Sequence, residues 1–170
     1  MRNRFMLALT AALISVVAMG GVVLATNPTG VNSTTLAIGR FDRNIDASTK
    51  TDIDPTARHH FWKTRITTKG STDVWMVENK IVPGGSFGWH SHPGPSLVIV
   101  KSGTLTLYRG DDPTCAPQVV GAGSGFVDDG GDIHLVRNEG TVETDVFVTS
   151  LVPAGFARRI DVPAPGNCPF

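Results

Sequence analysis

Three of the chain's five histidines lie in two glycine-rich segments, and histidine is the most common metal ligand among protein side chains. His90 and His92 are two residues apart, so in an extended strand their imidazoles point to the same face and can bind one ion. The Pro93-Gly94-Pro95 turn that follows cannot continue a strand, because proline has no N–H donor and a fixed φ. The second segment carries His134, which we expect to supply a third ligand to the same ion.

These two segments resemble the two conserved motifs of the cupin superfamily over residues 84–138. The matching residues fall in two groups, Gly84, His90, His92 and Gly103 in the first motif and Gly123, Gly131, His134 and Asn138 in the second. The resemblance implies a jelly-roll β-barrel with a metal centre inside it. Two positions depart from the family pattern. Asp129 replaces a proline, which we expect to alter only a turn, and Ser96 replaces the family's metal-binding glutamate.

The serine at position 96 changes the chemistry expected of this centre. A hydroxyl is neutral and a weak ligand, so three imidazoles alone leave the charge of a divalent ion uncompensated. Such a site favours zinc, iron, cobalt, nickel or copper over magnesium and calcium, which prefer oxygen ligands. In this it resembles metal-dependent cupins, such as thiol and diketone dioxygenases, that use three histidines without the glutamate. Glu78 could replace the missing carboxylate, and a metal-free pocket is the alternative to a metal centre.

Other residues near the histidines have two interpretations each. Asp132 and Asn138 are candidates either to hold the second ring nitrogen of a ligand histidine or to shape turns. His59 and His60 are adjacent, so in a strand they face opposite ways and cannot chelate one ion together. The tryptophans are expected to fill the barrel, and the one beside His90 is also a candidate for the pocket mouth: Trp62, Trp75 and Trp89.

The N-terminus has the features of a secretory leader. Residues 1–4 include two arginines, residues 5–24 are almost entirely apolar, and Val23-Leu24-Ala25 fits a small-residue cleavage site. We therefore expect a signal peptide over residues 1–25 and a secreted or extracytoplasmic protein. The apolar stretch is also about long enough to cross a bilayer, so an uncleaved anchor at the cell surface is the alternative.

The charge balance argues against binding of nucleic acid through a basic surface. The chain has 15 basic and 15 acidic residues, and loss of the leader removes two arginines. Cys115 and Cys168 both follow the leader, and an even count of cysteines in an oxidising compartment predicts a disulfide. Two unpaired thiols or a two-cysteine metal site are the alternatives. Closing this loop should contribute about 4 kcal/mol to stability.

Short runs rich in valine, isoleucine and threonine, separated by glycine, proline and aspartate turns, favour an all-β sandwich or jelly roll of one domain. The expected strands are 61–68, 74–82, 97–101, 104–108, 118–120, 133–138 and 144–151. The expected segments are an N-terminal tether and first strand over 26–60, the cupin β-barrel over 61–152, and a C-terminal tail over 153–170 held by the disulfide. Residues 26–35 are polar, and we expect them to form a flexible tether.

Together these features predict an exported cupin-type protein that binds a divalent transition metal through His90, His92 and His134. A metal-dependent dioxygenase or isomerase of a small molecule is the first hypothesis, because three protein ligands leave open positions for substrate. The alternative is an extracytoplasmic module that binds or senses a small ligand without catalysis, with the metal structural or absent. We expect membrane contact only through an uncleaved leader, and a homodimer is left open. The sequence identifies no general base beyond the ligands.

Overall fold

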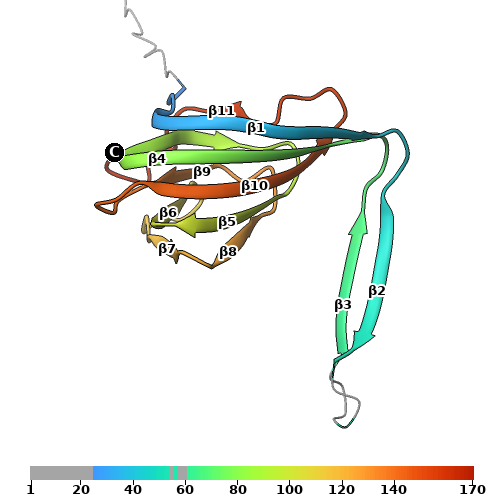
Figure 1. The fold of residues 1–170 in the computed structure, drawn as a ribbon. Coiled ribbons are helices and arrows are strands. Elements are labelled where there is room, and N and C mark those ends of the chain that lie inside the picture. Colours follow the sequence, from blue (N-terminus) through green and yellow to red (C-terminus); the bar gives the residue numbers. More distant parts are fainter. Residues whose placement is uncertain (1–24, 54–55, 57–60) are drawn as a thin grey trace, which may run out of the picture.

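The computed structural model describes residues 25–53, 56 and 61–170, which Figure 1 shows as a barrel of strands with one projecting hairpin. Its strands are, in chain order, β1 (Thr29–Phe41), β2 (Asp46–Asp52), β3 (Phe61–Thr67), β4 (Thr72–Ser91), β5 (Ser96–Ser102), β6 (Thr104–Arg109), β7 (Gln118–Gly121), β8 (Gly125–Asp128), β9 (His134–Arg137), β10 (Thr144–Pro153) and β11 (Ile160–Asp161). Residues 1–24 of the expected leader, and His59 and His60, lie outside the described residues. The described residues include no helix that could cross a membrane.

Nine of the described strands form one curved sheet in the order β7-β6-β9-β4-β10-β5-β8, with β1 and β11 also paired to β4. In Figure 1, β1, β4 and β10 run beside one another along one side of the barrel, and β5 to β8 form the opposite side. The all-β barrel predicted from the sequence is thereby confirmed.

The long strand β4 connects the two sides of this barrel. Over residues 72–81 it lies between β1 and β10, whereas its last residues pair with β9 and β11. The change of partners occurs at a bend, where Gly84 and Gly88 have positive φ angles of 77° and 71°. A Cβ atom at Gly88 would lie 2.2 Å from the Thr26 carbonyl oxygen, so both the angle and the space require glycine there.

Alternating side chains fill the interior of the barrel. In β5, Val98 and Val100 are buried, while the neighbouring Leu97 and Ile99 are about half exposed. Each aliphatic side chain buried in this way contributes about 1.5–3 kcal/mol. The main core is a cluster of such side chains from both sides of the barrel: Ile81, Val98, Val100, Leu105, Leu107, Val120, Val136, Val146 and Val148.

A second, smaller cluster lies beside the disulfide. Trp89, Tyr108 and Leu135 are buried there, with Cys115 and Cys168 packed against them. The two cysteines form the predicted disulfide, with their Cα atoms 5.3 Å apart. This bond ties the C-terminal tail to the loop between β6 and β7.

The tail packs along the last part of β4. In β11, Ile160 and Asp161 pair with Ser91 and His90. The backbone N–H of Val162 then donates to the Trp89 carbonyl at 3.1 Å. The tail therefore holds in place the strand end that carries the first histidine.

Two expectations about the N-terminal part are wrong, the flexible tether at residues 26–35 and the position of Trp62 inside the barrel. The flexible tether expected at residues 26–35 is mostly strand, because β1 pairs with β4 along its length. The side chains of β1 are nearly all exposed, including the apolar ones of Leu36, Ile38 and Phe41. The strand expected at residues 61–68 exists as β3, but it pairs with β2 in a separate hairpin that projects from the barrel in Figure 1. Trp62 on this hairpin is 52% exposed and does not fill the barrel.

Removal of the disulfide should destabilise the protein. We expect the C115A/C168A variant to lose about 4 kcal/mol of unfolding free energy, because the bond closes a loop with a sequence separation of 53 residues. Urea denaturation of the oxidised protein and the variant measures this difference. Reductant should lower the stability of the parent protein and leave the variant unchanged. Equal stability of parent and variant would contradict the prediction.

Candidate metal centre

The structure brings the three predicted imidazoles together inside the barrel. His90 lies near the end of β4, His92 follows this strand, and His134 begins β9 as the direct cross-strand partner of His90. One ring nitrogen from each histidine lies within 4.8 Å of those of the other two. All three residues are buried, with 4–6% of their surface exposed. This arrangement could hold one metal ion.

Backbone carbonyls fix the orientation of all three rings. The hydrogen bonds run from His90 Nδ1 to the Gly88 carbonyl at 2.8 Å, from His92 Nδ1 to the Arg158 carbonyl at 2.6 Å and from His134 Nδ1 to the Asp132 carbonyl at 3.0 Å. Because a carbonyl only accepts, each Nδ1 carries the proton and each Nε2 keeps its lone pair. This is the tautomer that a metal ion requires for binding through Nε2.

Burial keeps these imidazoles neutral. Desolvation lowers the pKa of His90, His92 and His134, and in His92 the pKa falls to about 4. For His90, the nearby His134 and Arg159 lower the pKa further by charge repulsion. At neutral pH the Nε2 lone pairs are therefore available.

The carboxylate of Asp128 lies close to the histidines and was not predicted from the sequence. Its Oδ2 atom lies 3.5 Å from His92 Nε2 and 3.7 Å from His134 Nε2. Asp128 ends β8 and is the direct cross-strand partner of Ser96 in β5, so both side chains point to the same face. One signal was present in the sequence. Phe126 and Asp128 are two residues apart with an outward-facing valine between them, which is the pattern of a strand. The segment was not expected to be a strand, however, and the pairing with Ser96 was not foreseen.

Asp128 is only partly satisfied by the protein. Its Oδ1 atom accepts from the Gly130 backbone N–H at 3.1 Å. Its Oδ2 atom is buried and has no hydrogen-bond partner among the residues that the structure describes. Such an oxygen is costly to bury unless a cation or a donor meets it. The donor set therefore fits a bound metal ion, with the orphaned oxygen facing the imidazoles.

The other expected contributors take different roles. Ser96 shares a hydrogen bond of 2.8 Å with Ser150, so its hydroxyl is not directed at an ion. Glu78 lies 3.8 Å from the Lys101 amine and does not replace the missing glutamate. Asp132 holds His134 through its backbone carbonyl, while its carboxylate is exposed and lies 3.8 Å from Arg109.

Asn138 shapes a turn and does not hold a ligand histidine. Its side-chain amide donates to the carbonyls of Ile81 and Val142 at 2.8 and 2.7 Å, and its oxygen accepts from the Gly140 N–H. These bonds connect β4 to the turn between β9 and β10. Trp89 is likewise structural, because it is buried beside the disulfide instead of lining the cavity.

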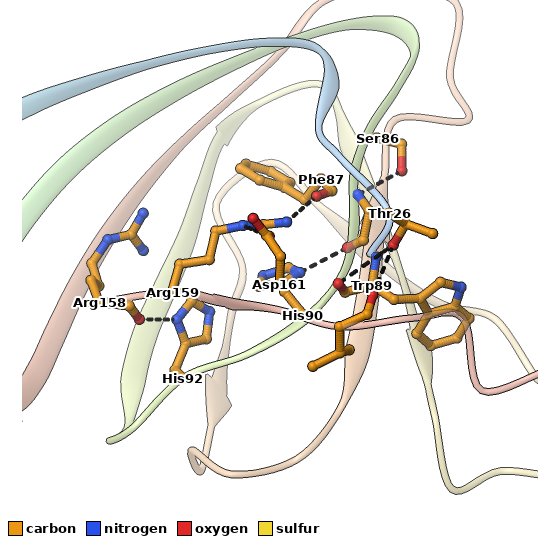
Figure 2. Close-up of polar contacts among 11 residues, drawn as sticks. Thr26, Ser86, Phe87, Trp89, His90, His92, Arg158, Arg159 and Asp161 are labelled. Carbon is orange, nitrogen blue, oxygen red and sulfur yellow. Dashed lines mark hydrogen bonds and ion pairs between the residues drawn. The ribbon is translucent and has the colours of Figure 1, made fainter. Parts of the chain in front are cut away.

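A cavity of about 270 Å³ adjoins the three imidazoles. Most of its wall is apolar and includes Val31, Phe87, Val98, Phe126, Val146 and Val148. Asp128 lies in the wall, as do Arg158 and Arg159 of the tail. Figure 2 shows the tail passing over the histidines, with the Arg158 carbonyl bound to His92.

The lowered pKa values predict that the metal-free protein loses stability in acid. The unfolded chain binds protons at its histidines below about pH 6.5, while folded His90 and His92 resist protonation until a lower pH, near 4 for His92. Stability should therefore fall as the pH drops below 6.5, by about 2 kcal/mol per buried histidine at pH 5. Urea unfolding of metal-free protein at pH 7 and 5 measures this loss, which should be smaller in His92→Gln. An equal loss in parent and variant would contradict the assignment.

Comparison with known proteins adds a family and several distant structures. No curated protein matches the sequence closely enough to count as a relative. An oxalate oxidase in complex with glycolate is 28% identical, covering 45% of this chain but only 41% of its own, with a TM-score of 0.41. A double-stranded β-helix protein from Klebsiella pneumoniae is 19% identical over 71% of this chain and 84% of its own, with a TM-score of 0.44. A cupin-like protein from Thermotoga maritima is 18% identical over 54% and 65%, with a TM-score of 0.45.

The family that matches is described as the cupin domain, and it covers residues 77–150. This range contains all three histidines, Asp128, and every strand from β5 to β9. The two histidine motifs, the barrel and the family match agree with one another. Residues 77–150 form a cupin domain.

Proposed function

We propose that this protein is an exported, metal-dependent cupin enzyme that acts on a small molecule bound in the cavity beside its histidines. The observation that carries the proposal is the set of three buried imidazoles, each held with a free Nε2 lone pair, around a point that also faces an orphaned carboxylate oxygen. A purely structural cluster would have no need of either feature. The disulfide is compatible with an oxidising compartment and supports export together with the expected leader.

The donor set narrows the choice of ion. His90, His92 and His134 would supply three nitrogen ligands, and Asp128 is close enough to compensate one positive charge of a divalent ion. Imidazole-rich sites favour zinc, iron, cobalt, nickel or copper over magnesium and calcium. When bound, such an ion would supply Lewis acidity that polarises an oxygen of the substrate.

Asp128 has a second capacity that bears on catalysis. It lies in the wall of the cavity, and its Oδ2 atom has no hydrogen-bond partner among the described residues. It can therefore accept a proton from a substrate bound there, as a general base does. Asp128 is therefore the candidate general base of the site, a role to which the sequence alone assigned no residue. An oxygenase or an isomerase is the reaction class that we favour, because each combines an open metal position with proton transfer.

The first test is metal content. We expect tag-free protein to bind one equivalent of zinc, and His90→Ala and His134→Ala each to lower the affinity by about 100-fold or more, because each removes a ligand. Isothermal titration calorimetry and metal analysis after dialysis measure this. The double variant His59→Ala/His60→Ala removes two other histidines and should bind zinc normally. Unchanged binding in either ligand variant would rule out the shared site.

The second test separates the two roles of Asp128. If the carboxylate binds the ion, Asp128→Asn should lower zinc affinity by about 10–100-fold, the range seen when groups that support a metal are lost. If it acts only as a base, zinc affinity should be retained and turnover lost. Unchanged affinity together with unchanged turnover would exclude both roles.

Turnover itself is tested with the iron(II)-loaded protein. Oxygen uptake is measured with small thiols, diketones and aromatic acids, and isomerisation of the same compounds is followed by NMR. Turnover of at least one compound that is lost in His134→Ala supports the enzyme. No turnover by a fully loaded protein favours the non-catalytic binding module.

A further inference from the structure

Two adjacent arginines of the C-terminal tail line the cavity of the metal centre. Arg158 and Arg159 lie just before β11 and are partly buried. Figure 2 shows both residues beside His92, with the Arg159 side chain extending towards Phe87 and the Arg158 side chain extending away from it. Both residues can therefore contact a ligand bound in this cavity.

Arg158 is held by its backbone and not by its side chain. Its carbonyl accepts the hydrogen bond from His92, but its guanidinium has no hydrogen bond or ion pair with any residue that the structure describes. Desolvation and the neighbouring Arg159 lower its pKa, yet an arginine stays charged in proteins. A partly buried cation without an anion is unfavourable until a ligand supplies one.

Arg159 is paired but still has a free donor. Its Nε binds the Asp161 carboxylate at 2.6 Å, and its Nη2 donates to the Phe87 carbonyl. Its Nη1 is buried and lacks a hydrogen-bond partner among the described residues. Arg159 is therefore neutralised in charge and can add one hydrogen bond to an anion held by Arg158.

The charged residues of the cavity wall leave one positive charge without an anionic partner. The imidazoles are neutral, and Asp128 is the one acidic residue among the described residues that line the cavity. It faces the imidazoles, where the metal would take up its charge. Arg158 then remains without a counter-charge, and a divalent ion would increase the positive excess.

The rest of the wall limits the body of the ligand. Apolar side chains, mainly valine and phenylalanine, form much of it, and its volume of about 270 Å³ is near the lower end of the range for ligand pockets. A charged or strongly polar group of a ligand would find partners only beside the imidazoles, Asp128, the two serines and the arginines. The ligand should therefore be small, with an apolar body and an anionic end.

We propose that the cavity binds a small organic carboxylate, with its carboxylate received by Arg158 and by Nη1 of Arg159 and its apolar body packed against the valines and phenylalanines. The planar guanidinium of Arg158 matches a carboxylate through two parallel hydrogen bonds. This inference deepens the proposed function by naming its substrate class, and rests on it for the identification of the cavity as the reaction site.

The experiment measures ligand binding with defined probes. Isothermal titration calorimetry of metal-free protein compares 3-methylbutanoate with its neutral amide, with acetate and with inorganic phosphate. The carboxylate should bind about tenfold or more tightly than the amide, because a charge-assisted hydrogen bond is lost with the charge. It should also bind more tightly than acetate and phosphate, because only its body fills the apolar wall.

The variant Arg158→Gln tests the receiving residue. It leaves the Arg158 carbonyl and its bond to His92 in place and removes an unpaired positive charge, so zinc affinity and melting temperature should not fall, while 3-methylbutanoate binding falls about tenfold or more. Arg158→Lys should restore part of the binding. Arg65→Gln, on the projecting hairpin, is the matched control and should bind normally.

Several outcomes would overturn the proposal. Equal binding of the carboxylate and the amide, equal binding by Arg158→Gln, absence of carboxylate binding, or phosphate bound as tightly as 3-methylbutanoate each contradicts it. Because these measurements use metal-free protein, failure to bind zinc would overturn the proposed function alone. Zinc binding without carboxylate binding would overturn this inference alone.

Discussion

The metal centre depends on the antiparallel pairing of β4 with β9, in which His90 and His134 are direct partners. Directly opposed residues of an antiparallel pair project to the same face a few ångströms apart, so pairing alone brings the two rings together. The backbone then orients them, because each imidazole donates to a carbonyl. The bend of β4 at Gly84 and Gly88 allows this contact, since it turns the strand from β10 towards β9. The centre is therefore a property of the closed barrel and not of either motif alone.

Two polar groups in the cavity are left unsatisfied by folding, and they carry opposite charges. Among the described residues, the Asp128 Oδ2 atom and Nη1 of Arg159 are both buried without a hydrogen-bond partner, and both residues line the same cavity. Most buried polar groups in native proteins are paired, and exceptions often mark sites where function required them. A bound cation would stabilise the Asp128 oxygen beside the histidines, and a bound anion would stabilise the arginines. The cavity could therefore hold a metal ion and an anionic ligand together.

The sequence predicted the parts of the site that follow a local pattern. The spacing of His90, His92 and His134 within glycine-rich segments identified the ligand cluster, and the short strand-like runs together with the cupin resemblance identified the barrel. Asp128 was missed because it replaces the lost glutamate across the sheet, from a strand beside Ser96, and not along the chain. Residues 29–35 of β1 were expected to be a tether because they are mostly polar, and their pairing with β4 is a long-range contact that local sequence does not reveal. The tail arginines carried no signal, since their approach to the cavity depends on tertiary packing.

The tail also determines when the centre is complete. It supplies the carbonyl that orients His92 and the arginines of the cavity wall, and the Cys115–Cys168 bond ties it to the barrel. A newly made chain with reduced cysteines lacks this covalent tie, so the tail can dissociate while the barrel core stays folded. In such a chain, His92 would lose the carbonyl that orients its ring whenever the tail dissociates.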